Sequence, residues 1–332
     1  MAELKIRGYW QNDYMLSKTA ENLYWAARYI ERADSIARLL EVAYRIHLIP
    51  NATTSYNNEW DSILQTLRIK EEYLEKNKVI KKEKIEFFLL FDLENQSSIF
   101  NCINRARENA KMVRTAITLE VWDAINITYH DLETYSKKKY NSKDLPEIID
   151  LVKKQVNLIR GTILNTQLVN DSYDFLSLGT HFERADFTAR IIDVKYFILL
   201  PNSELIGKDY DNFQWSLLLR AVSSFRGFKW AYGNSDIGYY KIIDFLILNM
   251  MCPRSLFYSI EKIDHHLKRL KKFYKKKSKA EELANTLHTN FNKLTVNNIL
   301  DNGLHEFLER FIIDLSEIYG QLESKYFLGA EK

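Results

Sequence analysis

Residues 23–42 read LYWAARYIERADSIARLLEV, and a diverged copy, FLSLGTHFERADFTARIIDV, occupies residues 175–194. Both stretches contain the block ERAD, followed at the same spacing by Ala-Arg, two aliphatic residues and an acid. The repeat is offset by 175 minus 23, or 152, residues, which is far longer than the unit of a solenoid. The sequence therefore predicts one ancestral half that was duplicated.

Each copy has the periodicity of an amphipathic helix. At about 100° per residue the apolar positions form one stripe, which in the first copy consists of Ile30, Ala33, Ile36, Ala37, Leu40 and Ala43. Arg32 and Arg184 fall at the edge of this stripe. An unpaired buried guanidinium is costly, so we expect both arginines to be mostly buried and to reach a carboxylate on another helix or in the opposite half.

Composition favours an all-α protein. The chain has 332 residues, of which 46% are hydrophobic, enough for a large core. Only 10 glycines and 4 prolines are present, so long helices are favoured over many short strands. The balance of 47 basic and 44 acidic residues gives no electrostatic case for nucleic acid as a main partner.

Cysteine usage and apolar runs bear on location. Cys102 and Cys252 cannot form a disulfide framework, and we expect both to be reduced thiols. The N-terminal segment has no apolar signal core, and the apolar runs at 197–200 and 245–248 are too short to span a bilayer. We expect a cytoplasmic protein that does not bind membranes.

The helical pattern predicts the order of elements. Helices are expected over about 17–47, 57–82, from 97 onward, over 122–135 and over 147–167, with a polar linker at 136–146. Further matches extend the repeat: Trp60 with Trp215, residues 91–100 with 248–257, and 145–161 with 304–320. We therefore assign residues 1–140 to a first repeat, 141–170 to a connecting helix that completes the first half, and 171–332 to a second, diverged repeat. The halves should form two helical bundles packed as one large domain, related by a pseudo-twofold with the ERAD helices near its axis.

A candidate binding site follows from polar residues that flank apolar stripes in the first half. Arg107 and Arg114 lie seven residues apart, with Asn109 nearby, and we expect them to converge with Arg28 near Glu31. The second half has replaced most of these residues. Such arginines suit a carboxylate- or phosphate-bearing ligand, and they equally suit a rigid polar network that holds helices in register.

Catalytic and cofactor patterns are missing from the sequence. No histidine follows an acid at the three-residue spacing of a di-iron carboxylate site. The sequence contains no HExxH, no cysteine-histidine zinc pattern and no P-loop. We predict no metal and no cofactor.

Two stretches resemble the alpha-E family of helical proteins, which takes its name from a Glu-Arg motif. The first, residues 15–41, carries Ser17, Ala20, Glu21, Asn22, Leu23, Trp25, Arg28, Tyr29, Glu31, Arg32, Ala33 and Arg38. The second, residues 91–126, carries Ser98, Cys102, Arg107, Glu108, Asn109, Arg114, Glu120, Trp122 and Asn126. The Glu-Arg motif carries over to Glu31 and Arg32, with Glu183 and Arg184 as the duplicate pair.

The resemblance implies a place in an amide-forming pathway, because genes of this family accompany circularly permuted ATP-grasp proteins and transglutaminase-like proteins. Three roles stay open. The protein could be an auxiliary component that binds an acidic peptide or phosphate group at an interior lined by Arg28, Glu31, Arg32, Arg107, Asn109, Arg114, Glu183 and Arg184. It could be an enzyme acting on a peptide intermediate with Glu31 or Glu183 as general base, which requires a raised carboxyl pKa. It could be a purely structural helical scaffold.

Overall fold

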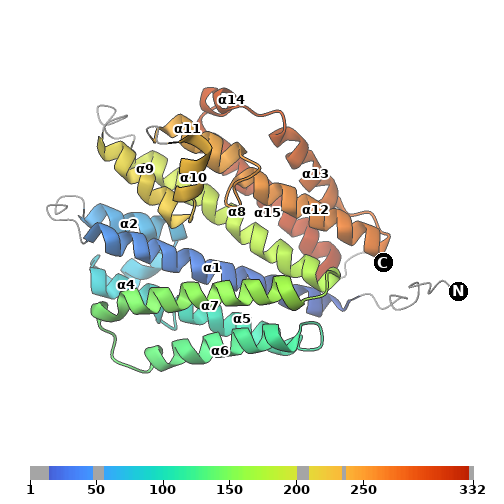
Figure 1. Ribbon diagram of the computed structural model, residues 1–332, viewed down its shortest axis with the longest axis horizontal. Helices are drawn as coiled ribbons and strands as arrows, with labels where there is room; N and C mark the ends of the chain where they lie inside the picture. The colour runs from blue at the N-terminus through green and yellow to red at the C-terminus, as the bar shows by residue number, and fades with distance from the viewer. Residues whose placement is uncertain (1–14, 48–55, 200–208, 234–236, 329–332) are drawn as a thin grey trace, which may run out of the picture.

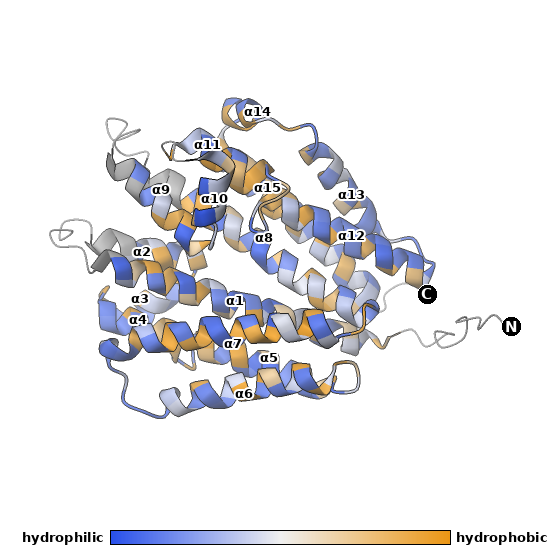
Figure 2. Cartoon of the chain, in the orientation of Figure 1, coloured by the Kyte–Doolittle hydropathy of each residue, from blue (hydrophilic) through white to orange (hydrophobic). Residues whose placement is uncertain are grey.

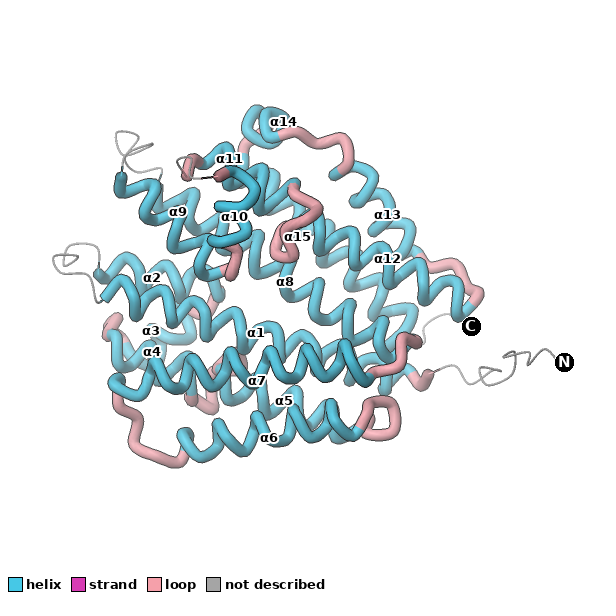
Figure 3. Tube along the Cα trace, viewed as in Figure 1, coloured by secondary structure: helices cyan, strands magenta, loops and turns pink. Residues whose placement is uncertain are grey.

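The fold is entirely helical where the structure describes it. The computed structural model describes residues 15–47, 56–199, 209–233 and 237–328, and within these ranges it contains helices and loops without a strand (Figures 1 and 3). The predicted all-α class is confirmed. Most helices carry both apolar and polar residues (Figure 2), as expected for helices that bury one face.

We call Glu31–Arg32 and Glu183–Arg184 the two ER pairs. The first part of the chain contains the first ER pair, the polar linker and the helix that follows this linker. Its helices are α1 (Ser17–His47), α2 (Tyr56–Leu67), α3 (Lys70–Asn77), α4 (Lys82–Leu90), α5 (Ile99–Met112), α6 (Leu119–Ser136), the 3₁₀ turn η1 (Ser142–Asp144) and α7 (Leu145–Thr166). The predicted bounds of α1 agree with the structure. The predicted linker is the connection between α6 and α7, and Pro146 lies in the first turn of α7, where its missing N–H costs nothing.

One sequence prediction is corrected here, because residues 57–82 do not form a single helix. Arg68 adopts a left-handed conformation with φ 55° and separates α2 from α3. The chain turns there through a hydrogen bond from Ile69 N–H to the carbonyl of Leu64, at 3.1 Å. Ile69 and Tyr73 then enter the core, so burial of these side chains explains the break.

The second part begins with the helix of the second ER pair. Its elements are α8 (Asp171–Leu199), α9 (Asp209–Ala221), α10 (Phe225–Tyr232), α11 (Tyr239–Ile243), η3 (Asp244–Leu248), α12 (Leu256–Tyr274), α13 (Lys279–Phe291), α14 (Val296–Asp301), α15 (Leu304–Leu322) and η4 (Glu323–Phe327). Helices α1 and α8 pack directly on each other. Helices α5 and α7 also pack against α1, and α12 and α15 pack against α8 (Figure 1). The two ER pairs therefore lie on adjoining helices in the middle of the molecule.

Some local features recur in the two parts. Ser98 caps α5 by accepting the N–H of Asn101, and Ser255 caps α12 by accepting the N–H of Tyr258. The matched tryptophan of α2 and that of α9 are both buried. These pairs agree with the sequence repeat, while the duplication of the whole chain and the boundaries of the halves remain predictions.

Gly179 allows α1 and α8 to approach closely. A Cβ atom at this position would lie 2.1 Å from the carbonyl oxygen of Tyr24 and 3.1 Å from Cβ of Ala27. Real Cβ atoms do not approach a backbone oxygen so closely, so only glycine fits without moving the helices apart. Glu183 follows Gly179 by one helical turn and Glu31 follows Ala27 by one turn, which brings the two ER pairs within bonding distance.

The close approach predicts an effect of substitution. Gly179→Ala should lower the free energy of unfolding by roughly 1–3 kcal/mol, the usual range for overpacking, because backbone atoms of α1 must move. The matched control is Gly161→Ala in α7, where an added Cβ meets nothing within 4 Å. It should be neutral or stabilise by up to about 1 kcal/mol through helix propensity. Urea denaturation measures both variants, and equal effects would contradict this explanation of the α1–α8 contact.

Candidate functional site

The two ER pairs exchange partners between α1 and α8. Glu31 accepts hydrogen bonds from Nε and Nη2 of Arg184, at 3.0 and 3.1 Å. Glu183 accepts from the same two atoms of Arg32, at 2.6 and 3.1 Å. The arginine side chains are 25% exposed for Arg32 and 12% for Arg184. The expectation that each arginine is mostly buried and reaches a carboxylate on another helix is confirmed.

Glu31 belongs to a larger cluster, which we call the Glu31 cluster. Arg160 of α7 donates through Nη2 to Glu31 at 2.5 Å and to Asp34 at 2.9 Å. Arg254, in the loop before α12, donates to the same two carboxylates at 2.6 and 3.1 Å. Both carboxylates are almost inaccessible to solvent. The Glu31 cluster therefore joins α1, α7, α8 and the α12 loop through charge-assisted hydrogen bonds.

Sequence reasoning missed three members of this cluster. Asp34 belongs to the repeated ERAD block, which was a usable signal that its side chain shares the environment of Glu31. Arg160 and Arg254 carry no such signal, because one lies on a distant helix and the other in a loop. Tertiary packing alone brings them to Glu31.

The second cluster, around Glu183, has a different set of donors. Besides Arg32, Arg28 donates from Nε to Glu183 at 2.7 Å. The guanidinium of Arg28 also lies over the ring of Trp25, 5.1 Å from its centroid, a cation–π contact. One turn further along α8, Asp186 accepts from Nη2 of Arg190 at 2.9 Å. We call these residues the Glu183 cluster.

The arginines keep the buried carboxylates ionised. Burial by itself would raise their pKa values, but Arg160, Arg184 and Arg254 hold the pKa of Glu31 well below its usual range. Burial also opposes ionisation of Glu183, yet its arginine partners lower the pKa of that carboxyl to about 2. A general base needs the opposite shift. The lowered pKa values therefore argue against Glu31 and Glu183 as catalytic bases.

The residues that were expected to converge do not lie together in the structure: Arg107 and Arg114 are separated from Arg28 and Glu31. Arg107 donates from Nε to Asn126 at 2.7 Å and lies over the ring of Tyr129, 4.7 Å from its centroid. The guanidinium of Arg114 lies 4.8 Å from the ring centroid of Trp122. These partners all belong to α6, whereas Arg28 and Glu31 bond to α8.

The expectation of one shared cleft is thus corrected, because α5 lies against both α1 and α6, and Arg107 on α5 and Arg114 just after it both contact α6. Asn109 is half-buried on the same helix. A ligand-binding role for Arg107, Asn109 and Arg114 remains a prediction.

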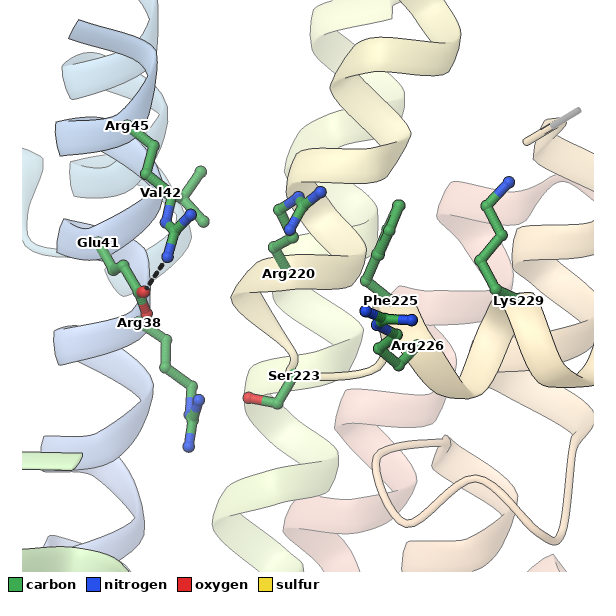
Figure 4. A pocket seen from close by; sticks show the side chains of 9 residues that line it. All are labelled: Arg38, Glu41, Val42, Arg45, Arg220, Ser223, Phe225, Arg226 and Lys229. Atoms are coloured by element: carbon green, nitrogen blue, oxygen red, sulfur yellow. Dashed lines mark hydrogen bonds and ion pairs between the residues drawn. The ribbon is translucent and has the colours of Figure 1, made fainter. Parts of the chain in front are cut away.

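A hollow rich in positive charge opens beside the Glu31 cluster, and we call it the basic pocket. It has a volume of about 550 Å³ and lies between α1, α9 and α10. Figure 4 shows Arg38, Glu41 and Arg45 on one wall, with Arg220, Arg226 and Lys229 across from them. The remaining lining residues are Val42, Ser223 and Phe225. Five basic side chains thus line the pocket against one carboxylate.

Another hollow, of about 390 Å³, is lined by residues of α7, α8 and α12. Arg160 and Arg184 reach it from the Glu31 cluster, and His181 and His266 also line it. His266 Nδ1 lies 2.7 Å from Asp174 Oδ1. Burial and the neighbouring Arg184 lower the pKa of His181 well below its usual value, so this ring is neutral.

The described residues offer neither a metal site nor a membrane-spanning helix. Among the described residues no group of three His, Cys, Asp or Glu side chains is arranged to hold a metal ion. No helix within the described ranges has the length and apolar character needed to cross a membrane.

The Glu31 cluster predicts a large loss of stability when its carboxylate is neutralised. Glu31→Gln leaves three arginines without their shared counter-ion and should lower the free energy of unfolding by roughly 3–5 kcal/mol, the range for breaking a buried ion pair. Glu108→Gln is the control, because Glu108 forms a half-exposed pair with Arg107 and should cost less than about 1 kcal/mol. Chemical denaturation of both variants checks the difference, and a small loss for Glu31→Gln would show that the cluster does not lock the helices.

A second prediction concerns acid. The pKa of Glu183 falls from an ordinary 4.5 to about 2 on folding, so its ionised form stabilises the native state above pH 4.5. This stability should be lost as the pH falls from about 4.5 through 2, and the linkage amounts to about 3 kcal/mol. Glu183→Gln should flatten the acid limb in a series of urea denaturation curves at stepped pH. An unchanged acid slope would contradict the assigned ion pairs.

Comparison with known proteins gives a match to a protein family. No curated protein and no solved structure matches the chain. A family model described as a predicted alpha-helical domain with a conserved ER motif matches residues 15–327. This range extends from the start of α1 to the end of η4 and contains both ER pairs that exchange partners. The chain therefore belongs to the Alpha-E family.

Proposed function

We propose that this Alpha-E protein is an auxiliary component that binds an acidic peptide or a phosphate group in the basic pocket. The supporting observation is the charge of the lining, in which five basic side chains face one carboxylate. That carboxylate, Glu41, already accepts hydrogen bonds from Arg45 at 2.8 Å and from Lys153 at 2.7 Å. The pocket thus has an uncompensated positive charge, which favours an anionic ligand.

The basic pocket suits this role better than the ER clusters do. In the clusters the arginines are paired with buried carboxylates, so most of their donors are occupied. Across the pocket, no carboxylate of the described ranges pairs with Arg220, Arg226 or Lys229. Guanidinium forks bind carboxylate and phosphate groups through two parallel hydrogen bonds. A ligand held by both walls would join α1 to α9 and α10.

The basic pocket is also connected to the Glu31 cluster. Arg38 lines the pocket, and its Nε lies 3.0 Å from Asp34 Oδ1. An anion that draws Arg38 toward the pocket would weaken this pair. Ligand binding would then change the charge balance of the Glu31 cluster, which provides a route from the pocket to the centre of the fold.

The cellular setting of the proposal comes from the family. We propose an ATP-grasp amide ligase and a transglutaminase-like protein as partners, and an acidic peptide as the shared ligand. An auxiliary protein in such a system would hold the peptide by its carboxylates while the ligase forms the amide bond. Co-purification of this chain with the ATP-grasp partner, in the presence and absence of the peptide, tests the association.

The scaffold alternative rests on a different observation, namely that the ER pairs lock α1 to α8. A lock of this kind and a ligand site at its edge are compatible. The enzyme alternative with Glu31 or Glu183 as base has less support, because both carboxyl groups have lowered pKa values.

The proposed site predicts which substitutions weaken binding. Arg226→Gln and Arg220→Gln should each lower the affinity for pentaglutamate peptide or pyrophosphate by about 1.5–3 kcal/mol, the range for charged hydrogen bonds. Melting temperature without ligand should stay nearly unchanged, because both arginines are exposed. The control is Arg310→Gln, which removes the same charge from a side chain that is 71% exposed on α15.

Isothermal titration calorimetry at low and moderate salt measures the effect. Binding should weaken as salt rises, since the contacts are ionic. Absence of binding to both probes, or an equal loss in the Arg310 variant, would reject the basic pocket as the site.

A further inference from the structure

We propose that a small cavity in the Glu183 cluster binds a guanidinium-bearing ligand, in the position that the side chain of Arg254 occupies in the Glu31 cluster. The two clusters have nearly the same core. Arg184 donates to Glu31 from Nε to Oε1 and from Nη2 to Oε2, and Arg32 donates to Glu183 through the same pairs of atoms. They can therefore be compared atom by atom.

The comparison shows which acceptors differ. Oε1 of Glu31 accepts a second hydrogen bond, from Nη1 of Arg254 at 2.6 Å. Oε1 of Glu183 receives only the bond from Arg32 among the described residues. Likewise, Oδ2 of Asp34 accepts from Nη2 of Arg254 at 3.1 Å.

The matching acid of the second pair is Asp186. It bonds to Arg190 through Oδ1, and no donor in the described ranges reaches its Oδ2. The two acceptor positions that Arg254 fills in one cluster are therefore open in the other.

A single difference in sequence, Ser97 in place of Arg254, explains why these two acceptor positions are open in the Glu183 cluster. When residues 91–100 are aligned with 248–257, Ser97 matches Arg254. Each residue directly precedes a serine that caps the next helix, Ser98 before α5 and Ser255 before α12. A serine cannot fill the volume of an arginine side chain, and a cavity of about 200 Å³ is present beside it, with Arg32, Ser35, Ser97, Glu183, Asp186 and Arg190 in its lining.

The lining offers hydrogen-bond acceptors to a ligand. Oγ of Ser35 is buried, with the residue 2% exposed, and has no hydrogen-bond partner in the part of the chain that the structure describes. Together with the open positions on Glu183 and Asp186, it can accept N–H groups that enter the cavity. A guanidinium has five N–H donors and no acceptor, in a planar fork that matches carboxylates.

The charge of the cluster also allows a further cation. Three arginines, Arg28, Arg32 and Arg190, face two carboxylates in the Glu183 cluster. In the Glu31 cluster four arginines face two carboxylates, and they are Arg38, Arg160, Arg184 and Arg254. One added guanidinium would give the Glu183 cluster four guanidinium groups against two carboxylates, which is the ratio already present in the Glu31 cluster. An anion is the rival ligand, because Nε of Arg190 is buried without an acceptor among the described residues.

The experiment uses the full chain and three probes, with melting temperature and calorimetric affinity as readouts. Methylguanidinium chloride at millimolar concentration should raise the melting temperature saturably in the wild type. Tetramethylammonium chloride, a cation without N–H donors, should not. Sodium phosphate tests the rival anion.

Ser97→Arg should fill the cavity, lower the affinity for methylguanidinium at least about tenfold, as expected when charged hydrogen bonds are lost, and raise the melting temperature of the unliganded protein. Gln96→Arg adds the same charge at an exposed neighbouring residue and should bind like the wild type.

Asp186→Asn provides an independent test if Ser97→Arg does not fold. It removes one carboxylate that faces the cavity and should also weaken methylguanidinium binding about tenfold or more. The proposal is overturned if the wild type shows no saturable binding of methylguanidinium, or if its affinity is unchanged in the variant that folds. It is equally overturned if phosphate, rather than methylguanidinium, binds in a way that Ser97→Arg or Asp186→Asn alters.

Discussion

The exchange of partners between two Glu-Arg pairs is the interaction on which the rest of the structure depends. Glu31 of α1 bonds to Arg184 of α8, and Glu183 of α8 bonds to Arg32 of α1. Ionised groups are tolerated in an apolar interior only when each finds partners of opposite charge in good geometry. This requirement sets the register of α1 against α8. Gly179 meets it by letting the two backbones approach to a distance that any other residue would prevent.

The ionic interior limits the chemistry available at the centre of the molecule. Carboxylates that are held ionised by several arginines are poor proton acceptors, and arginines that are held by carboxylates have few donors left for a ligand. The proposed binding sites therefore lie where the network ends. Arg38 forms one such edge, because it pairs with Asp34 and also lines the basic pocket. The Glu183 cluster forms another, where a serine stands at the position of an arginine and a cavity results.

The two clusters also show how similar sequence motifs can take different roles. Arg254 closes the Glu31 cluster and is itself fully committed, and burial lowers its pKa to about 10, so it still carries its charge at neutral pH. Ser97 leaves the corresponding place open in the Glu183 cluster. A serine in place of an arginine, one residue ahead of a helix cap, thus leaves a cavity in one cluster, while the bonds between the ER pairs themselves are the same in both.

The sequence by itself determined the helical class, the bounds of α1 and the burial of both ER arginines, because these follow from local periodicity and from the cost of an unpaired charge. The repeated block places Asp34 and Asp186 three residues after the glutamates, but sequence reasoning did not predict that Asp34 belongs to the Glu31 cluster. Only the tertiary structure decided which arginines meet which acids. Arg160 and Arg254 reach Glu31 through the packing of α7 and the course of a loop, while Arg107 and Arg114 turn toward α6 instead. Helical periodicity specifies the face of a helix on which a residue lies, but the neighbour that covers this face depends on how distant helices pack and how loops return.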